Sequence, residues 1–176
     1  MRDIDTQKYG RVALFLHWLM AGLIIFNIGA AKLTEDLSRE TRGQWMYQHK
    51  AVGTLILGLI IWRLIWRLTH DVPPLPHNIS KLNRVLAHAG HWTLYGLMIF
   101  VPLTGFLKEL VRGRDIGLWL FDLQSPFSSD VATAKIFGSL HDLTGNITMF
   151  LVAGHIIMVL FHQYYLRDKL INRMTP

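Results

Sequence analysis

Four apolar blocks, each about twenty residues long, constrain the fold of this chain more than any other feature. They run over residues 12–31, 49–68, 87–107 and 141–162. The hydrocarbon core of a bilayer is about 30 Å thick, and a helix needs about twenty residues to cross it. Because lipid offers no partner for a free backbone N–H or C=O group, each block is predicted to be a helix. The sequence therefore predicts an all-α fold, a transmembrane four-helix bundle that forms a single membrane domain over residues 1–176.

The composition supports a membrane protein and excludes several other classes. The chain is 51% hydrophobic, with a formal net charge of +6. In a membrane protein such basic residues gather at helix ends, so we expect no nucleic-acid partner. The chain has no cysteine, which excludes disulfides, iron–sulfur clusters and covalently attached c-type haem. The first apolar block is too long for the core of a signal peptide, and we expect it to be retained.

The distribution of basic residues predicts the orientation. Four spans place both termini on one side, together with a proline-rich linker at 71–80. That side carries ten Lys and Arg against four Asp and Glu, whereas the opposite side carries eight of each. The positive-inside rule then predicts cytoplasmic termini in a bacterial inner membrane, with loops 32–48 and 108–140 in the periplasm. In the longer loop, we expect Trp119, Leu120 and Phe121 to lie on the membrane surface.

Histidines occupy two depths of the predicted bundle. Histidine inside a membrane span is costly and usually functional. His155 follows His141 by fourteen residues, about 21 Å along a helix and close to the same face. His141 is expected near the periplasmic surface together with His49, and His155 near the cytoplasmic surface together with His17. Because a bis-histidine haem needs one neutral imidazole on each face of the porphyrin, the pattern predicts two noncovalent haem b groups.

The surroundings of these histidines leave alternatives open. Six glycines could give a porphyrin room, although ordinary helix packing explains them equally well: Gly22, Gly53, Gly58, Gly96, Gly145 and Gly154. His88 and His91 share a helix face at the cytoplasmic level, so one of them could replace His17 or His155 as an iron ligand. Otherwise they could contact a haem propionate or a quinone, or simply begin a helix. His162 suits a substrate pocket or the membrane interface.

Several short segments form one combined pattern. They are residues 9–18, His49 with Gly53, Arg63 with Arg67, residues 86–91, Pro102 with Gly105, residues 162–165, Arg167 with Asp168, and Arg173 with Met174. This pattern resembles the bacterial cytochrome b561 family, short four-helix dihaem proteins of the inner membrane. The resemblance implies that His17 with His155 binds the cytoplasmic haem, and His49 with His141 the periplasmic one. The chain departs from the family at Gln163, where relatives often carry a second consecutive histidine, and at Lys169, where they often carry asparagine.

The resemblance also implies a function. A studied member of the family oxidises superoxide outside and passes the electrons to ubiquinone, so we expect the same chemistry here, without an obligate protein partner. The cofactors would supply the chemistry, and no side chain needs to act as a nucleophile. Six basic residues could steer the superoxide anion, or could simply be interfacial: Arg39, Arg42, Lys50, Lys108, Arg112 and Arg114. The quinone is expected near His162, His88, His91 and Gln163.

Two other functions stay open. A cytochrome b subunit that oxidises quinol and feeds a periplasmic oxidoreductase would use the same histidines in the opposite direction. A metal transporter could use the histidines as a relay. Asp142 is the single Asp or Glu within the four spans, and so few carboxylates disfavour transport of a divalent cation. An absorption spectrum with and without dithionite separates haem chemistry from metal transport.

Overall fold

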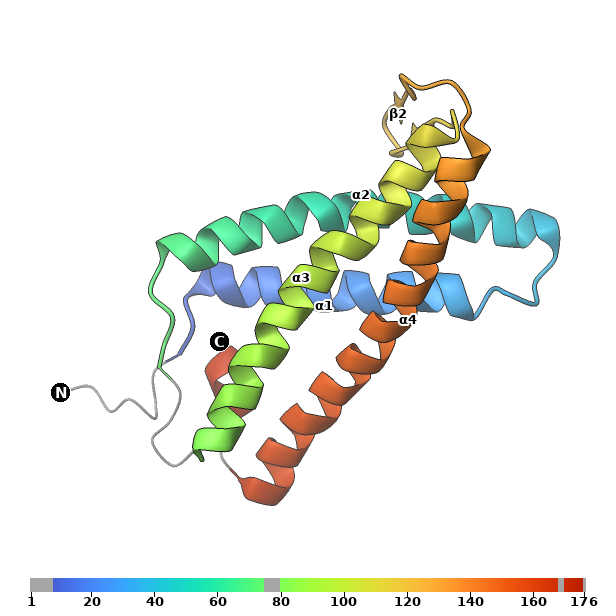
Figure 1. Cartoon of the computed structure of the whole chain (residues 1–176). Helices are drawn as coiled ribbons and strands as arrows, with labels where there is room; N and C mark the ends of the chain where they lie inside the picture. Colours follow the sequence, from blue (N-terminus) through green and yellow to red (C-terminus); the bar gives the residue numbers. More distant parts are fainter. Residues whose placement is uncertain (1–7, 75–79, 168–169, 176) are drawn as a thin grey trace.

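Four long helices dominate the computed structural model, which describes residues 8–74, 80–167 and 170–175. They are α1 (Arg11–Lys32), α2 (Arg39–Thr69), α3 (Lys81–Val111) and α4 (Val131–Leu160). Each is long and apolar enough to cross a membrane, which confirms the predicted fold class (Figure 1). Asp168, Lys169 and half of the proline-rich linker, residues 75–79, lie outside the described residues.

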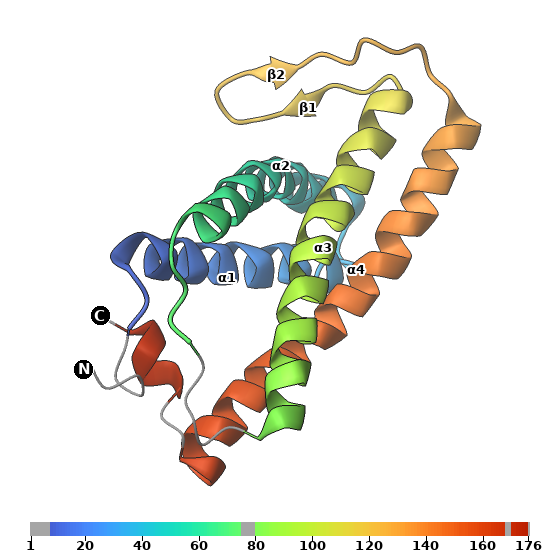
Figure 2. The ribbon, with the colours of Figure 1, turned by 60° about the vertical axis from the view of Figure 1, so that its left-hand side comes forward.

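The helices pair as two antiparallel hairpins, α1 with α2 and α3 with α4. The hairpins cross obliquely and touch mainly through α2 and α3 (Figures 1 and 2). Buried side chains at this crossing are Met20 from α1, Val52, Ile56 and Ile60 from α2, and Tyr95 from α3. In each of the four helices, at most 22% of an apolar 18-residue stretch is buried inside the chain. The remaining apolar surface is therefore left for lipid to cover.

Three helices begin before the predicted spans because their polar first turns are capped. The side chains of Ser38, Ser80 and Asp130 each accept a hydrogen bond from the backbone N–H three residues further on. Helix α2 thus starts ten residues before His49, and α4 ten residues before His141. The expected loops 32–48 and 108–140 therefore include helical turns, and the connections between helices are residues 33–38 and 112–130.

The longer connection forms a small β-hairpin beyond the ends of α3 and α4. Its strands are β1 (Ile116–Gly117) and β2 (Asp122–Leu123), paired antiparallel (Figure 2). The Trp119 backbone N–H donates to the Tyr47 hydroxyl at 3.1 Å, and its indole N–H donates to Gln48 Oε1 at 2.8 Å. Leu120, between the strands, is 93% exposed, so the predicted contact with the membrane surface stays a prediction that this shape allows. We call this end of the molecule the hairpin end.

The opposite end, the termini end, is covered by the C-terminal segment. Helix α4 continues as a π-helical turn, Phe161–Leu166, and a 3-10 helix follows at Leu170–Met174. The Trp18 indole N–H donates to the Met174 carbonyl oxygen at 2.7 Å. The Tyr9 backbone N–H donates to the Arg173 carbonyl oxygen at 3.1 Å. Both ends of the described chain therefore lie together, as an even number of spans requires (Figure 1).

Candidate functional site

Histidine side chains gather at two levels of the molecule. Towards the hairpin end, His49 of α2 faces His141 of α4, with ring centroids 5.9 Å apart and planes at 87°. Towards the termini end, His155 of α4 faces His91 of α3, with ring centroids 5.8 Å apart and planes at 70°. His17 of α1 is close enough to His91 and His155 to interact electrostatically with both. We call these the hairpin-end pair and the termini-end group.

The ring separations fit a bis-histidine haem. A bond between a metal and an imidazole nitrogen is about 2 Å long, so imidazoles on opposite faces of one iron have ring centres about 6 Å apart. Both facing pairs have this separation, and the partners come from different helices. The chain thus presents suitably spaced imidazoles at two levels.

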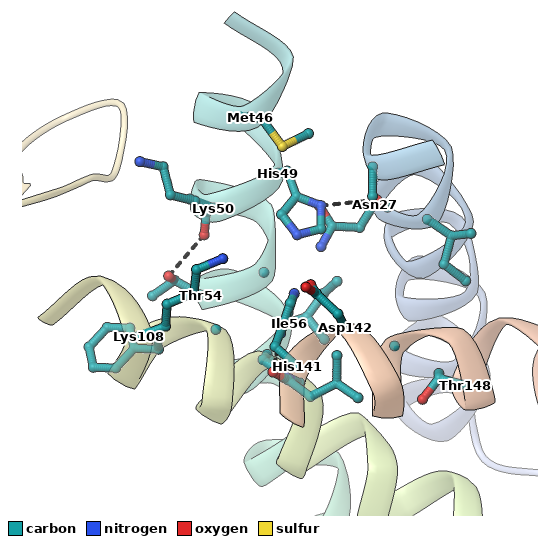
Figure 3. A pocket seen from close by; sticks show the side chains of 18 of the residues that line it. Asn27, Met46, His49, Lys50, Thr54, Ile56, Lys108, His141, Asp142 and Thr148 are labelled. Atoms are coloured by element: carbon teal, nitrogen blue, oxygen red, sulfur yellow. Dashed lines mark hydrogen bonds between the residues drawn. The ribbon is translucent and has the colours of Figure 1, made fainter. Parts of the chain in front are cut away.

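Backbone carbonyl groups hold the hairpin-end pair. His49 Nδ1 lies 3.1 Å from the Asn27 carbonyl oxygen on α1 (Figure 3), and His141 Nδ1 lies 2.9 Å from the Val101 carbonyl oxygen on α3. Since a carbonyl oxygen can only accept, each Nδ1 carries the proton and each Nε2 keeps a free lone pair. This is the arrangement that metal-binding histidines usually adopt.

Gly105 of α3 makes room for the His141 ring. A Cβ atom at this position would lie 2.8 Å from His141 Cε1 and 2.9 Å from Nδ1, closer than real side chains approach. Gly105 is not among the six glycines expected to accommodate a porphyrin. Of those six, a Cβ at Gly53 would meet Asn27 Nδ2 at 3.5 Å, whereas at the other five it would meet no described atom within 4 Å. Gly105 was noted only as part of the family pattern, and its closeness to His141 was not predicted.

The hairpin-end pair opens into a cavity of about 680 Å³ that all four helices line. Figure 3 shows His49, His141 and Asp142 pointing into this space. The side-chain oxygen of Asn27, which also lines it, is buried without a hydrogen-bond partner among the described residues. Such an orphaned atom marks a place where a ligand or water is expected. Spacing, tautomer, volume and the close glycine together fit a haem here.

The cavity wall is basic, as the proposed steering of an anion requires. Five of the six expected steering residues line it, namely Arg42, Lys50, Lys108, Arg112 and Arg114, whereas Arg39 does not. Lys50 Nζ lies 3.4 Å from Glu109 Oε2, and Glu109 is only 8% exposed. Glu35 and Asp142 also line the cavity, so three carboxylates offset part of the positive charge.

The termini-end group is held differently. His17 Nδ1 lies 3.0 Å from Nη2 of Arg63 on α2. A guanidinium group can only donate, so this Nδ1 accepts and the proton of the neutral ring sits on Nε2. His17 must exchange this partner before its Nε2 could bind iron. Since His155 makes its ring contact with His91, the scheme in which His91 replaces His17 stays open.

The residues expected to contact a quinone do not form one cluster. His91 belongs to the termini-end group, His162 is buried in the π-helical turn, and His88 is exposed on α3. Gln163 joins the C-terminal segment to this turn, because its Oε1 accepts from the Ile171 backbone N–H at 3.3 Å. None of these four residues lines the hairpin-end cavity.

Sequence reasoning also missed the groups that orient the histidines. Asn27, Val101 and Gly105 act on His49 or His141 from neighbouring helices, through a backbone carbonyl or through space. Arg63 was noted only as part of the family pattern. Its position one turn before Arg67 in a membrane span was the available signal, because a charge at such a depth is usually functional.

Three relatives and one family model match almost the whole chain. A probable superoxide oxidase CybB of Yersinia pestis is 29% identical over 173 residues, covering 97% of each chain. Cytochrome b561 homolog 2 of Escherichia coli (strain K12) is 29% identical over 174 residues, covering 96% of this chain and 91% of the relative. Cytochrome b562 of Cereibacter sphaeroides is 30% identical over 172 residues, covering 94% of each. The family model for prokaryotic cytochrome b561 matches residues 8–176, and the chain belongs to this family.

Proposed function

We propose that this protein is a dihaem oxidoreductase of the inner membrane that oxidises superoxide at its periplasmic face and reduces ubiquinone. Family membership implies b-type haem, and the two histidine levels support two of them. The observation that carries the proposal is the hairpin-end pair, with rings 5.9 Å apart and both Nδ1 protons donated to carbonyl oxygens. Haem b, when bound, supplies reversible one-electron exchange at its iron.

At the hairpin end, the chain would bind the cofactor and attract the substrate. His49 and His141 offer Nε2 lone pairs in a fixed orientation, and Gly105 keeps the His141 ring unobstructed. The basic cavity wall favours approach of an anion and accelerates encounter at low salt. The relative from Yersinia pestis, a probable superoxide oxidase, supports superoxide as that anion.

At the termini end, we propose that His155 binds a second iron together with His17, and that His91 is the alternative partner. His155 lies fourteen residues after His141 on α4, about 21 Å further along the helix axis. The two ligand sets would then lie near opposite surfaces of the bilayer. We place the quinone at this end as well, where His162, His88 or His91 could pass on protons from the cytoplasm.

The first experiment counts the haems in protein purified in detergent. We expect two b-type haems per chain, with reduced bands that appear after dithionite. His49→Ala should remove one haem and His155→Ala the other. Loss of the second haem in His17→Ala but not in His91→Ala would support His17 as the partner of His155, whereas the reverse result would select His91.

The second experiment supplies the electron donor. Superoxide added to the oxidised protein should reduce it without any partner, and ubiquinone should then reoxidise it. Reduction by quinol alone, with no response to superoxide, would instead support a subunit that feeds a periplasmic oxidoreductase. A colourless protein that binds a metal ion would support transport, although the described residues contain no group of three or more metal-binding side chains.

A third experiment concerns the route of the protons. His162→Ala should slow ubiquinone reduction while both haems stay bound and superoxide still reduces them. Normal turnover of the variant would exclude this role for His162. Tyr164→Phe is a matched control, because Tyr164 lies in the same π-helical turn, is 73% exposed and is not among the residues expected near the quinone.

A further inference from the structure

Two arginines lie beside the termini-end group and contact aromatic rings. Arg63 and Arg67 lie one turn apart on α2, and both are half-buried. Their guanidinium carbons lie 5.6 Å and 5.5 Å from the centre of the Tyr95 ring, which is 5% exposed. Arg67 also lies 5.9 Å from the Trp92 ring. The aromatic rings thus fix two cations at one site.

Nothing described in the chain neutralises these cations. Within residues 8–74, 80–167 and 170–175, the ion pairs are Lys32 with Glu35 and Lys50 with Glu109, and neither arginine has a carboxylate partner. Both lie in a helix long and apolar enough to cross a membrane, where an unpaired charge is costly. A resident anion would offset this cost.

The two guanidinium groups also have free donors. Each guanidinium carries five N–H bonds. Arg63 donates through Nε to the Tyr95 hydroxyl at 3.2 Å and through Nη2 to His17 Nδ1 at 3.0 Å. The Arg67 guanidinium makes no hydrogen bond with the described residues. Most of the ten N–H bonds therefore remain for an acceptor, and arginine matches the flat, two-oxygen geometry of a carboxylate.

The position of the arginines indicates which anion they bind. Arg63 follows His49 by fourteen residues on α2, the same spacing that separates His141 from His155 on α4. It therefore lies level with the termini-end group and touches His17 directly. Arg67 lies about 6 Å further towards the end of the molecule. An anion bound here would lie at the edge of a group that the termini-end histidines bind.

We propose that Arg63 and Arg67 bind the two propionate carboxylates of the haem held by the termini-end group. This inference rests on the proposed function, since it requires a haem at that level. It also explains the inverted hydrogen bond of His17. If Arg63 were paired with a propionate instead of His17, the neutral ring could carry its proton on Nδ1, and Nε2 would be available to bind iron. Haem binding and ligand preparation are thereby one event.

The test compares haem b with its dimethyl ester, in which both propionates are uncharged. Protein made without haem is loaded with either form in a His49→Ala background, which leaves the termini-end group as the binding site. We expect the His49→Ala protein with both arginines intact to bind haem b about ten-fold more tightly than the diester. Arg63→Gln with Arg67→Gln should abolish this preference. Arg84→Gln, which changes an exposed arginine on α3, should keep it.

A second measurement avoids the His49→Ala background. Resonance Raman spectra of protein with both haems intact should show shifted propionate bending bands in Arg63→Gln and in Arg67→Gln, but not in Arg84→Gln. Unchanged bands with unchanged preference for haem b would overturn the inference. So would loss of bound phospholipid phosphate from the variants without any change in haem preference. Absence of porphyrin from every variant would contradict the proposed function itself.

Discussion

The two histidine levels differ in what holds their rings, although their facing rings are almost equally far apart. At the hairpin end, Nδ1 of His49 and of His141 donates to a backbone carbonyl. At the termini end, Nδ1 of His17 accepts from the side chain of Arg63. A helix carbonyl cannot titrate or turn away, whereas an arginine side chain can change partner. The hairpin-end pair is therefore preorganised for metal binding, and the termini-end group is adjustable.

The largest effect is expected from Gly105→Ala. The added methyl group must displace the His141 ring, which would lie under 3 Å from it. Overpacking of this kind costs about 1–3 kcal/mol, and here it acts on a candidate ligand. We expect loss of the hairpin-end haem, measured by haem content and reduced spectrum, while the termini-end haem stays bound.

Gly90→Ala is the matched control on the same helix, because Gly90 is exposed, is not among the glycines expected to accommodate a porphyrin, and a Cβ there would meet no described atom within 4 Å. This variant should keep the hairpin-end haem. Equal haem content in Gly105→Ala and the parent protein would mean that the room beside His141 is not needed for binding.

A smaller effect is expected when lysine replaces Arg63, because lysine keeps the positive charge but lacks the planar guanidinium group. Arg63→Lys places a flexible ammonium group where a planar guanidinium donates to both Tyr95 and His17. The termini-end haem should stay bound with a shifted midpoint potential, and the hairpin-end haem should be unaffected. A potential shifted equally at both haems would remove the distinction between the two levels.

Glu109→Gln should raise the rate of reduction by superoxide. The substitution leaves Lys50 without its carboxylate partner and adds one positive charge to the cavity wall. We expect a gain of about two- to five-fold in dilute buffer that disappears at high salt, because screening weakens steering. Stopped-flow kinetics over a range of ionic strength measures it.

Glu40→Gln provides the comparison for this charge. Glu40 lies in the exposed first turn of α2 and does not line the cavity. The same gain in both variants would attribute the effect to net charge rather than to the cavity wall.

The smallest effect is expected at Asp130, the cap of α4. Hydrogen bonds from the Thr133 side chain and backbone hold the pKa of this exposed carboxyl below its usual value of 3.8. Its stabilising contribution is therefore present above pH 3.8 and is lost as the pH falls through the lower pKa of the folded state. Thermal unfolding from pH 6 down to about pH 3 should show a small acid-dependent loss that Asp130→Asn lacks. A loss of equal size in the variant would assign the effect to other carboxyl groups.

Much of the fold follows from the sequence because membrane spans are local features. Apolar length alone predicts four helices, and the periodicity within the fourth block predicts that His141 and His155 lie at different depths on one face. The helix starts were harder to predict. Capping by Ser38 and Asp130 adds polar turns to α2 and α4 that hydropathy does not register.

The environment of the histidines could not be predicted in the same way. Gly105 matters because His141 approaches it from another helix, and Val101 acts through a carbonyl group that every residue possesses. Their depths in the predicted spans paired the four candidate ligands, and the family pattern, confirmed by the prokaryotic cytochrome b561 match, implies the same pairs. Because the His155 ring contacts His91 in the structure, the pairing of His155 with His17 stays a prediction.

The most direct measurement of the central claim is the number of haems per chain in the parent protein, in His141→Ala and in His155→Ala. A pyridine haemochrome assay against quantitative amino-acid analysis should give two, one and one. The reduced spectra of the two variants should add up to that of the parent protein. A single haem per chain in the parent protein would contradict two separate histidine-held sites. So would the same haem spectrum in both variants, because it would mean that neither substitution removes that haem.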